Sequence, residues 1–283
     1  MPHHIKVGNI DIFAVSDGMS RLPAMFFPGL DVQAHPEVLD GDGTVHIPTG
    51  CFLIRSADRT VLVDAGLGPV SLPFPEGMPT ARAEPGRPVQ FMAEGGKLPA
   101  ALAKVGCQAE DVDTLFLTHL HPDHVGWVAP SGVPHFPKAR VVFGAADWGA
   151  LIEPAPADDP GRVGLVGARD AGRTEPIAED VVSIAPGVTA RRAAGHTPGH
   201  YVLVISSGSE RALLLGDAVQ CPLQLTESDI AFLSDVDPVL ARQTRELLFR
   251  EIEQDGALVG MDHFPGLEFQ RILPGSRRSW ATA

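Results

Sequence analysis

The chain has 283 residues, 44% hydrophobic and 20% charged, which is ordinary for a globular protein able to bury a sizeable core. Its formal net charge of −13 argues against nucleic acid as the main partner, because binding a phosphate backbone needs a basic face. No apolar run predicts a membrane-spanning helix, and the N-terminus lacks the basic-then-apolar pattern of a signal peptide. We therefore expect a cytoplasmic protein with no membrane or nucleic-acid partner.

The N-terminal third alternates between strands and long loop-like regions. The first fifteen residues alternate in polarity around Gly8-Asn9 and predict a β-hairpin. Residues 17–45 are loop-like, and strong strand patterns follow at 50–55 and 60–64. A second loop-like region, 68–97, carries six prolines. Loops this long often serve as lids or binding loops, with disorder as the alternative.

The middle of the chain predicts shorter elements. A short helix is expected at 98–105, a buried strand at 112–118, another strand at 140–143 and a helix around 145–152. Residues 154–176 are again rich in proline, glycine and alanine, like the loop-like regions before them.

Short strand patterns return from residue 181, with the sequences VVSI, VTARRA, YVLVIS and RALLLGD. Asp237-Pro238 then starts the clearest helix, with an apolar stripe that ends near Gly256, and a last strand, ALVGM, follows it. We find no repeat of short period and no linker between independent cores. Residues 1–283 are therefore expected to form one domain of two packed sheets with outer helices.

The three cysteines, Cys51, Cys107 and Cys221, lie far apart and form no CxxC motif. Their number is odd, so we expect buried or half-buried thiols and no disulfide framework.

The sequence THLHPDHVG at 118–126 concentrates three histidines and an aspartate directly after a buried strand. His119 and His121 cannot share a helix face, and Pro122 would interrupt a helix through them. On extended chain, however, residues two apart point the same way and can hold one ion. Asp123 and His124, just past the proline, can serve a second ion, and zinc takes both ligand types. A chance cluster is the alternative.

Three later strand ends offer further ligands. His196 lies in a turn after VTARRA, Asp217 follows the apolar run RALLLG, and Asp262-His263 follows ALVGM. Each of these residues could simply be a turn, cap or loop residue. Together with the first cluster, however, they indicate ligands that all lie along one edge of a β-sandwich.

These motifs, taken in order, resemble the metallo-β-lactamase superfamily over about residues 50–272. The matching sequences are TVLVDAGLG at 60–68, HLHPDH at 119–124, GHTPGH at 195–200, LLGD at 214–217 and DH at 262–263. The resemblance implies a four-layer αββα sandwich. It implies two zinc ions, other divalent metals being an alternative, with the ligands His119, His121, Asp123, His124, His196, Asp217 and His263.

The resemblance also implies residue roles. Asp217 would bridge the two ions and fix their spacing, and a hydroxide shared between them would attack a carbonyl or phosphoryl centre. Asp123 would accept a proton as the intermediate collapses, so Asp123 and Asp217 are the candidate catalytic residues. Asp64 would support the site from behind, and His200 would lie outside the ligand set.

Within the superfamily, the chain is most similar to the acyl-homoserine lactonase and methyl parathion hydrolase-like group. One departure concerns the tyrosine that better-known lactonases carry three residues after the bridging aspartate, where it helps to hold the substrate carbonyl. That position is Gln220 here, and the single tyrosine, Tyr201, lies elsewhere. Gln220 is the candidate substrate-binding residue, which would donate a weaker hydrogen bond to the carbonyl; the alternative is that the carbonyl relies on the metals alone.

These features predict a dinuclear zinc hydrolase acting on a lactone or carboxylic ester. A homodimer is the oligomeric state that the resemblance suggests. Phosphotriester hydrolysis at the same metals is the alternative enzyme, and a metal-binding protein without catalysis is the alternative outside enzymes. Residues 1–49 and 68–97 are expected to shape the pocket or an interface. Apolar candidates for the pocket lining, each also suited to the core, are Met25, Phe26, Phe27, Phe74, Phe91, Met92 and Trp127.

Overall fold

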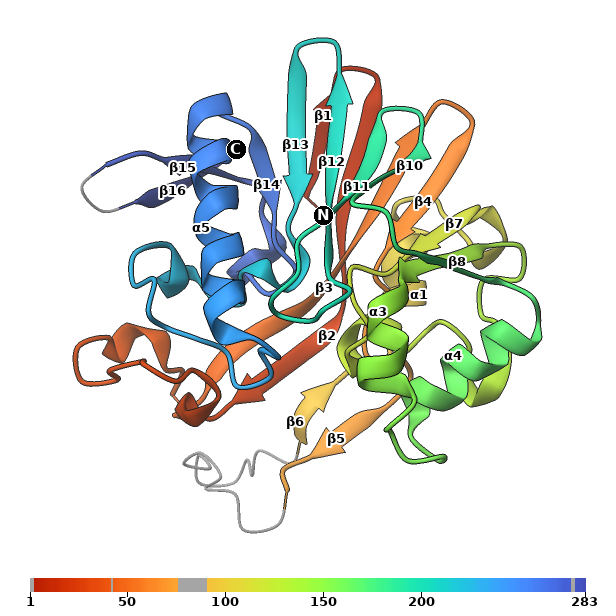
Figure 1. The fold of residues 1–283 in the computed structure, drawn as a ribbon, viewed down its shortest axis with the longest axis horizontal. Coiled ribbons are helices and arrows are strands. Elements are labelled where there is room, and N and C mark those ends of the chain that lie inside the picture. The colour runs from red at the N-terminus through yellow and green to blue at the C-terminus, as the bar shows by residue number, and fades with distance from the viewer. Residues whose placement is uncertain (1–2, 42, 76–90, 276–277) are drawn as a thin grey trace.

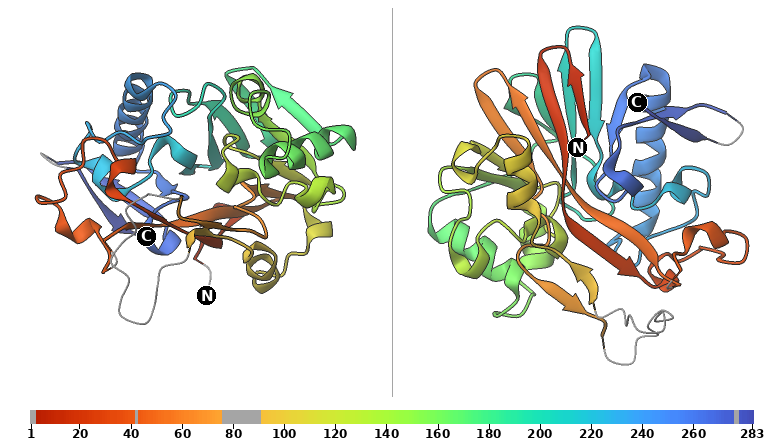
Figure 2. Two further views of the ribbon diagram at one scale, coloured as in Figure 1. Left: turned by 90° about the horizontal axis from the view of Figure 1, so that it is seen from below. Right: turned by 180° about the vertical axis from the view of Figure 1, so that it is seen from behind.

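The computed structural model describes residues 3–41, 43–75, 91–275 and 278–283. In this part of the chain two sheets pack face to face, and helices cover both outer faces (Figure 1). Seen from behind, helix α5 (Pro238–Asp255) lies on one side of the strands and the helices α1 (Leu98–Lys104) and α4 (Pro160–Asp170) lie on the other (Figure 2). This is the predicted four-layer αββα sandwich.

The first sheet is built from the N-terminal part of the chain. Its described strands lie in the order β5-β6-β2-β3-β4-β7-β8-β9, with β1 also paired to β2. Their bounds are β1 (His4–Val7), β2 (Ile10–Leu22), β3 (Val45–Ser56), β4 (Arg59–Val63), β5 (Ser71–Pro73), β6 (Phe91–Glu94), β7 (Thr114–Phe116), β8 (Arg140–Gly144) and β9 (Thr174–Ile177). The predicted hairpin around Gly8-Asn9 is confirmed as the β1–β2 pair.

The second sheet uses the C-terminal part, and its described strands lie in chain order from β10 to β16. Their bounds are β10 (Val181–Ala185), β11 (Val188–Arg192), β12 (Tyr201–Ser207), β13 (Glu210–Leu214), β14 (Leu258–Gly260), β15 (Gln270–Leu273) and β16 (Ser279–Thr282). Since β11 and β12, and β12 and β13, are antiparallel, β11 runs in the same direction as β13. Strand β14 is parallel to β13, so β11, β13 and β14 all end at one edge.

The core between the sheets follows from residue alternation along the strands. In β3, Phe52 and Ile54 face the second sheet, whereas Leu53 faces the outer helices. Strand β12 contributes Leu203 and Ile205 to the same inner core. Because side chains in a strand alternate between faces, both faces of these apolar strands are buried.

The outer helices close the two remaining layers. Leu102 of α1 and Leu165 of α4 pack on the outer face of the first sheet. Phe249 and Ile252 of α5 pack on the outer face of the second. The remaining helices are short, α2 (Pro122–Val125) and α3 (Ala145–Asp147), the latter continued by a helical turn over Trp148–Ile152. None of the described helices has the length and apolarity needed to cross a membrane.

The predicted start of α5 is confirmed. The Asp237 carboxylate accepts a hydrogen bond from the Leu240 amide, Pro238 occupies the first helical position, and Gly256 ends the helix at a φ of +63°. The three cysteines are buried and free, as expected.

Two regions that we predicted to be loops contain strands or a helix. Strand β2 continues through Asp17-Gly18 to Leu22 with a bulge between Ser16 and Gly18, and β3 begins at Val45, so both ends of the predicted loop at 17–45 belong to strands. Helix α4 lies inside 154–176, where its glycines hid the helical pattern. The 68–97 region includes β5 and β6 at its ends, and its residues 76–90 lie outside the described part of the chain.

Candidate metal centre

The 118–126 sequence follows strand β7 and turns into α2. His121 is extended, with φ −73° and ψ 158°, and Pro122 takes the first helical position. Asp123 and His124 therefore lie in the first turn of a helix. The amide of Tyr201 donates to the carbonyl of Thr118 at 2.9 Å, which joins the end of β7 to the second sheet.

A first group of donor atoms comes from both sheets and comprises His119, His121, His196 and Asp217. His121 Nδ1 lies 2.9 Å from His119 Nε2 and 2.9 Å from His196 Nε2. His196 Nε2 lies 3.3 Å from Asp217 Oδ2. Three ring nitrogens facing one another at this range need a shared cation or proton between their lone pairs.

A second group comprises Asp123, His124 and His263. His263 Nε2 lies 3.6 Å from Asp123 Oδ2, and His124 Nε2 lies 3.8 Å from Asp123 Oδ1. Asp123 is the most open member, with 25% of its side chain exposed, whereas both histidines are buried.

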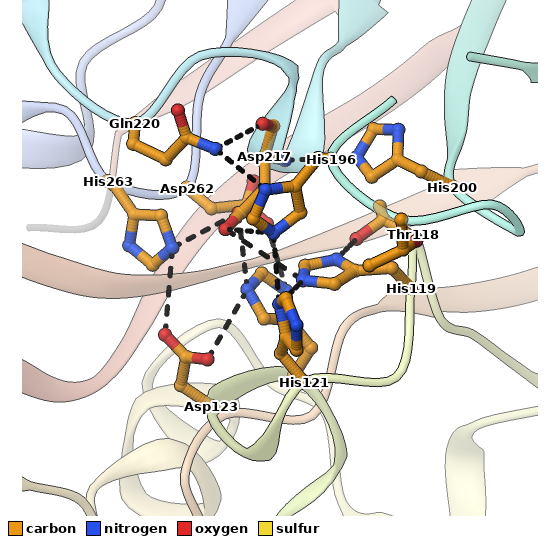
Figure 3. A network of polar contacts seen from close by, with 12 residues as sticks. Thr118, His119, His121, Asp123, His196, His200, Asp217, Gln220, Asp262 and His263 are labelled. Carbon is orange, nitrogen blue, oxygen red and sulfur yellow. Dashed lines mark hydrogen bonds and ion pairs between the residues drawn. The ribbon is translucent and has the colours of Figure 1, made fainter. Parts of the chain in front are cut away.

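The carboxylate of Asp217 lies between the two groups (Figure 3). Its Oδ2 faces His196 and His119, at 3.3 and 3.8 Å. Its Oδ1 faces His263 Nε2 at 3.1 Å and His124 Nε2 at 3.2 Å. One carboxylate thus turns one oxygen toward each group, which is the geometry that the predicted bridging role requires.

The donor set fits a divalent metal centre. Imidazole nitrogens and carboxylate oxygens are ligands that zinc and related divalent ions take. Among the described residues, the buried side-chain atoms without a hydrogen bond include both ring nitrogens of His124 and Asp217 Oδ1. Since buried polar atoms are almost always paired, these atoms indicate a missing positive ligand.

The electrostatics support the same reading. Burial lowers the pKa of His119 well below its ordinary value and that of His121 to about 4. Both imidazoles are therefore neutral at pH 7, and each has a lone pair available for a metal ion. Burial alone would also lower the pKa of His263, but the adjacent Asp217 carboxylate raises it to about 9. A metal ion at this second group would displace that proton.

Two buried carboxylates lie behind His124. Asp64 accepts hydrogen bonds from the amide and the hydroxyl of Thr118, both at 2.8 Å, and its Oδ2 lies 3.1 Å from His124 Nδ1. Burial, together with the neighbouring Asp64, raises the pKa of Asp262 well above its usual range. Asp64, His124 and Asp262 form a third group of donor atoms. Asp64 contacts His124 from behind, as expected.

His200 lies outside these groups. Its Nδ1 faces the carbonyl of Ala193 at 3.1 Å, and its Nε2 accepts the amide hydrogen of Asp217 at 3.1 Å. Burial lowers the pKa of His200 to about 3, so the imidazole stays neutral and holds the backbone at Asp217.

Gln220, predicted to contact substrate, is fully buried. Its side-chain nitrogen donates to the backbone carbonyl of Asp217 at 2.6 Å, and its Oε1 has no hydrogen bond. Contact with substrate therefore stays a prediction.

Two buried aspartates escaped the sequence analysis. Asp147 accepts hydrogen bonds from the amides of Leu120 and Gly199 and from the hydroxyl of Thr197, and so ties the HLHPDH loop to the GHTPGH loop. Asp235 lies 2.8 Å from His196 Nδ1. Asp147 comes soon after strand β8, as the other acidic residues come after their strands, but it is the third residue of helix α3. For Asp235, the sequence contains no signal that distinguishes it from its neighbours in the loop.

A cavity of about 680 Å³ lies beside His263. Its lining includes apolar residues from β2, β3 and the C-terminal hairpin, and acidic residues from the segment between β2 and β3. The apolar members are Met19, Val38, Val45, Ile47, Pro48, Cys221, Pro222, Leu223, Pro265 and Trp280, and the acidic ones are Glu37 and Asp40. The apolar candidates named from the sequence do not line this cavity. Phe27 belongs to a buried cluster, and Trp127 donates to Asp17.

Comparison with known proteins agrees with this geometry. Residues 47–263 match the family model of the Metallo-beta-lactamase superfamily, so the chain belongs to that superfamily. It is a metal-dependent hydrolase of this class. The resemblance predicted from the motifs is confirmed.

Two curated relatives are N-acyl homoserine lactonases. AiiA of Bacillus thuringiensis subsp. kurstaki is 22% identical over 234 residues, which is 83% of this chain and 88% of the relative. AiiB of Agrobacterium fabrum is 27% identical over 179 residues, 60% of this chain and 62% of the relative.

Solved structures share the fold. The hydrolase AbOPH in the beta lactamase superfamily superposes with a TM-score of 0.82 at 22% identity, covering 100% of this chain and 97% of that chain. The dizinc quorum-quenching lactonase AidC, solved with a product, superposes with a TM-score of 0.81 at 20% identity, covering 99% and 96%.

Proposed function

We propose that the protein is a dinuclear zinc-dependent hydrolase that opens a lactone or cleaves a carboxylic ester. The observation that carries this proposal is the Asp217 carboxylate, whose two oxygens face two separate groups of buried donors. The first zinc would be held by His119, His121 and His196, and the second by Asp123, His124 and His263. Asp217 would bridge them.

Each part of the centre has a distinct task. Two bound divalent cations lower the pKa of water and polarise a carbonyl oxygen. Asp217 fixes the spacing of the two donor groups, and His200 and Thr118 hold the backbone and the carboxylates around it. Asp123, the most exposed carboxylate of the set, would take up the proton released by the attacking water and pass it to the departing alkoxide oxygen as the ester bond breaks.

The choice of substrate rests on the relatives and on the cavity. The curated relatives are lactonases, and the cavity beside His263 combines a mostly apolar lining with space for a small ester. Its acidic members, Glu37 and Asp40, disfavour anionic substrates. Gln220 replaces the tyrosine of better-known lactonases, so carbonyl binding would depend more on the metals.

The test combines metal analysis with a substrate panel. Purified protein loaded with zinc is expected to contain two zinc ions per chain and to hydrolyse lactones or neutral esters. Gln220→Ala should raise KM if the amide contacts substrate, and Gln220→Glu keeps the size while adding a charge. One iron per chain would overturn the dinuclear zinc centre.

A phosphotriester on the same panel tests the alternative activity. Turnover of the phosphotriester above every lactone and ester would replace the proposed substrate class, while the metal centre would stand. No turnover on any ester, lactone, thioester or phosphoester by protein holding both metals would refute hydrolysis of these classes. A single domain, a homodimer and a cytoplasmic location stay predictions, for which limited proteolysis, light scattering and cell fractionation are the measurements.

A further inference from the structure

We propose that Asp235 is a positioning residue for the metal centre: it holds the imidazole of His196 so that Nε2 is presented to the first metal. The inference rests on the proposed metal centre. Asp235 lies outside every motif that identified the superfamily, on the segment between Leu225 and α5, here called the 226–237 segment.

The contact between the two side chains is short and buried. His196 Nδ1 lies 2.8 Å from Asp235 Oδ1, and only 1% of each side chain is exposed. The second oxygen of Asp235 accepts the amide hydrogen of Phe232 at 3.0 Å. Both carboxylate oxygens therefore have a donor, as a buried carboxylate requires.

This contact determines which ring nitrogen of His196 carries the hydrogen. Asp235 can only accept, so Nδ1 donates and Nε2 keeps its lone pair. Nε2 is the atom that faces His121 Nδ1 at 2.9 Å and Asp217 Oδ2 at 3.3 Å. Gln220 Nε2 lies 3.1 Å from His196 Nδ1 but has only hydrogens to offer, so Asp235 is the acceptor.

The backbone around Asp235 holds it in register with His196. The amide of Val236 donates to the carbonyl of His196 at 2.9 Å, and the amide of Asp237 donates to that of Gly195 at 3.0 Å. The buried Arg245 of α5 donates from Nη2 to the carbonyls of Ser228 and Ile230, at 3.3 and 3.2 Å. Helix α5 thus anchors the 226–237 segment, and the segment anchors the ligand.

The expected consequence is a change in metal affinity. A carboxylate on the far nitrogen of a ligating imidazole fixes the ring and increases its basicity, and its loss typically costs about 10- to 100-fold in metal affinity or activity. Asp235→Asn keeps the shape and removes the charge. It is therefore expected to weaken binding of one of the two zinc ions about 10- to 100-fold.

The experiment measures zinc binding by competition with a chromogenic chelator in wild type, Asp235→Asn and Asp229→Asn. Asp229 is the matched control because it lies on the same segment, is 81% exposed and pairs only at the surface with Arg242. The absorption spectrum of the cobalt-loaded proteins is the second readout. It should change for Asp235→Asn alone, whereas a purely structural role would lower the melting temperature without altering the spectrum of the bound metal.

A third measurement uses the wild type alone, so it does not depend on whether a variant folds. Long-range ¹H–¹⁵N spectra of the zinc-loaded wild type should show His196 protonated at Nδ1. Equal zinc affinity and cobalt spectra in wild type and Asp235→Asn, or a His196 ring without the Nδ1 proton, would overturn the inference and leave the proposed function standing. A wild type that binds no zinc would overturn the metal centre, and this inference with it.

Discussion

Asp217 is the residue on which both donor groups depend. Asp217→Asn keeps the volume of the side chain but removes its charge and one of its two acceptor oxygens. The two donor groups would then lose the carboxylate that they share. If the metal ions stabilise the transition state by several kcal/mol less, kcat should fall about a thousandfold. Metal content by elemental analysis and kcat on the best substrate of the panel check this prediction.

The control for Asp217→Asn is Asp58→Asn, because Asp58 has an 82% exposed side chain. It should keep the metal content and kcat of the wild type. A variant at position 217 with two metals and unchanged kcat would show that Asp217 does not bridge.

His200 predicts a pH dependence of stability. Its folded-state pKa is about 3 because of burial, whereas an unfolded histidine titrates near 6.5. Below pH 6.5 the unfolded chain binds the extra proton, so the free energy of unfolding falls with acid, by up to about 1.4 kcal/mol per pH unit down to about pH 3. Stability from the neutral His200 is thus present above pH 6.5 and lost as the pH falls.

The measurement is urea unfolding of the metal-free protein at pH 7 and pH 5, in wild type and His200→Gln. Glutamine does not titrate, yet it can donate to Ala193 and accept from Asp217. The stability difference between the two proteins should therefore shrink at pH 5. If the difference is the same at both pH values, the neutral imidazole contributes no acid sensitivity.

At the level of elements, α4 depends on a glycine that ordinary helix propensity disfavours. A Cβ on Gly167 would clash with the carbonyl oxygen of Gly132, so α4 approaches the turn at Pro130–Gly132 only because the side chain is absent. Gly167→Ala should therefore destabilise the protein, by about 1–3 kcal/mol, although alanine favours helices.

Gly149→Ala is the comparison for Gly167→Ala, because a Cβ at Gly149 meets no atom within 4 Å. Chemical denaturation of both variants decides the point. Equal effects at the two positions would mean that the contact with Gly132 does not limit α4.

The same elements show what the sequence could and could not predict. Strands and candidate metal ligands were predictable because strand patterns are closely followed by histidine or aspartate at 119–124, 196, 217 and 263. Helix α4 was hidden because its glycines serve a tertiary contact, and the bulge at Asp17-Gly18 has the composition of a turn. Asp235 and Asp147 were missed because a lone aspartate signals nothing until folding places its partner beside it.

For the whole molecule, the donor groups join both sheets. Since metal ions bind the folded state and hardly the unfolded chain, free metal at 100 times Kd should stabilise it by about 2.7 kcal/mol. Removal by a chelator is expected to lower Tm by several degrees, and added zinc should restore it. Calorimetry with and without chelator measures this shift, and an unchanged Tm would contradict a metal shared between the sheets.

The division of the strands between the sheets also sets an order of assembly. Strands β1 to β9 come from residues 4–177, and β10 to β16 come from residues 181–282, so the sheets are built from successive parts of the chain, the first of them longer. During synthesis the first part emerges with four of the seven donors and cannot complete either group. Bringing such distant segments together costs loop-closure entropy. A metal ion shared by these donors would therefore bind only after the two parts of the chain have docked, and its binding would report that docking.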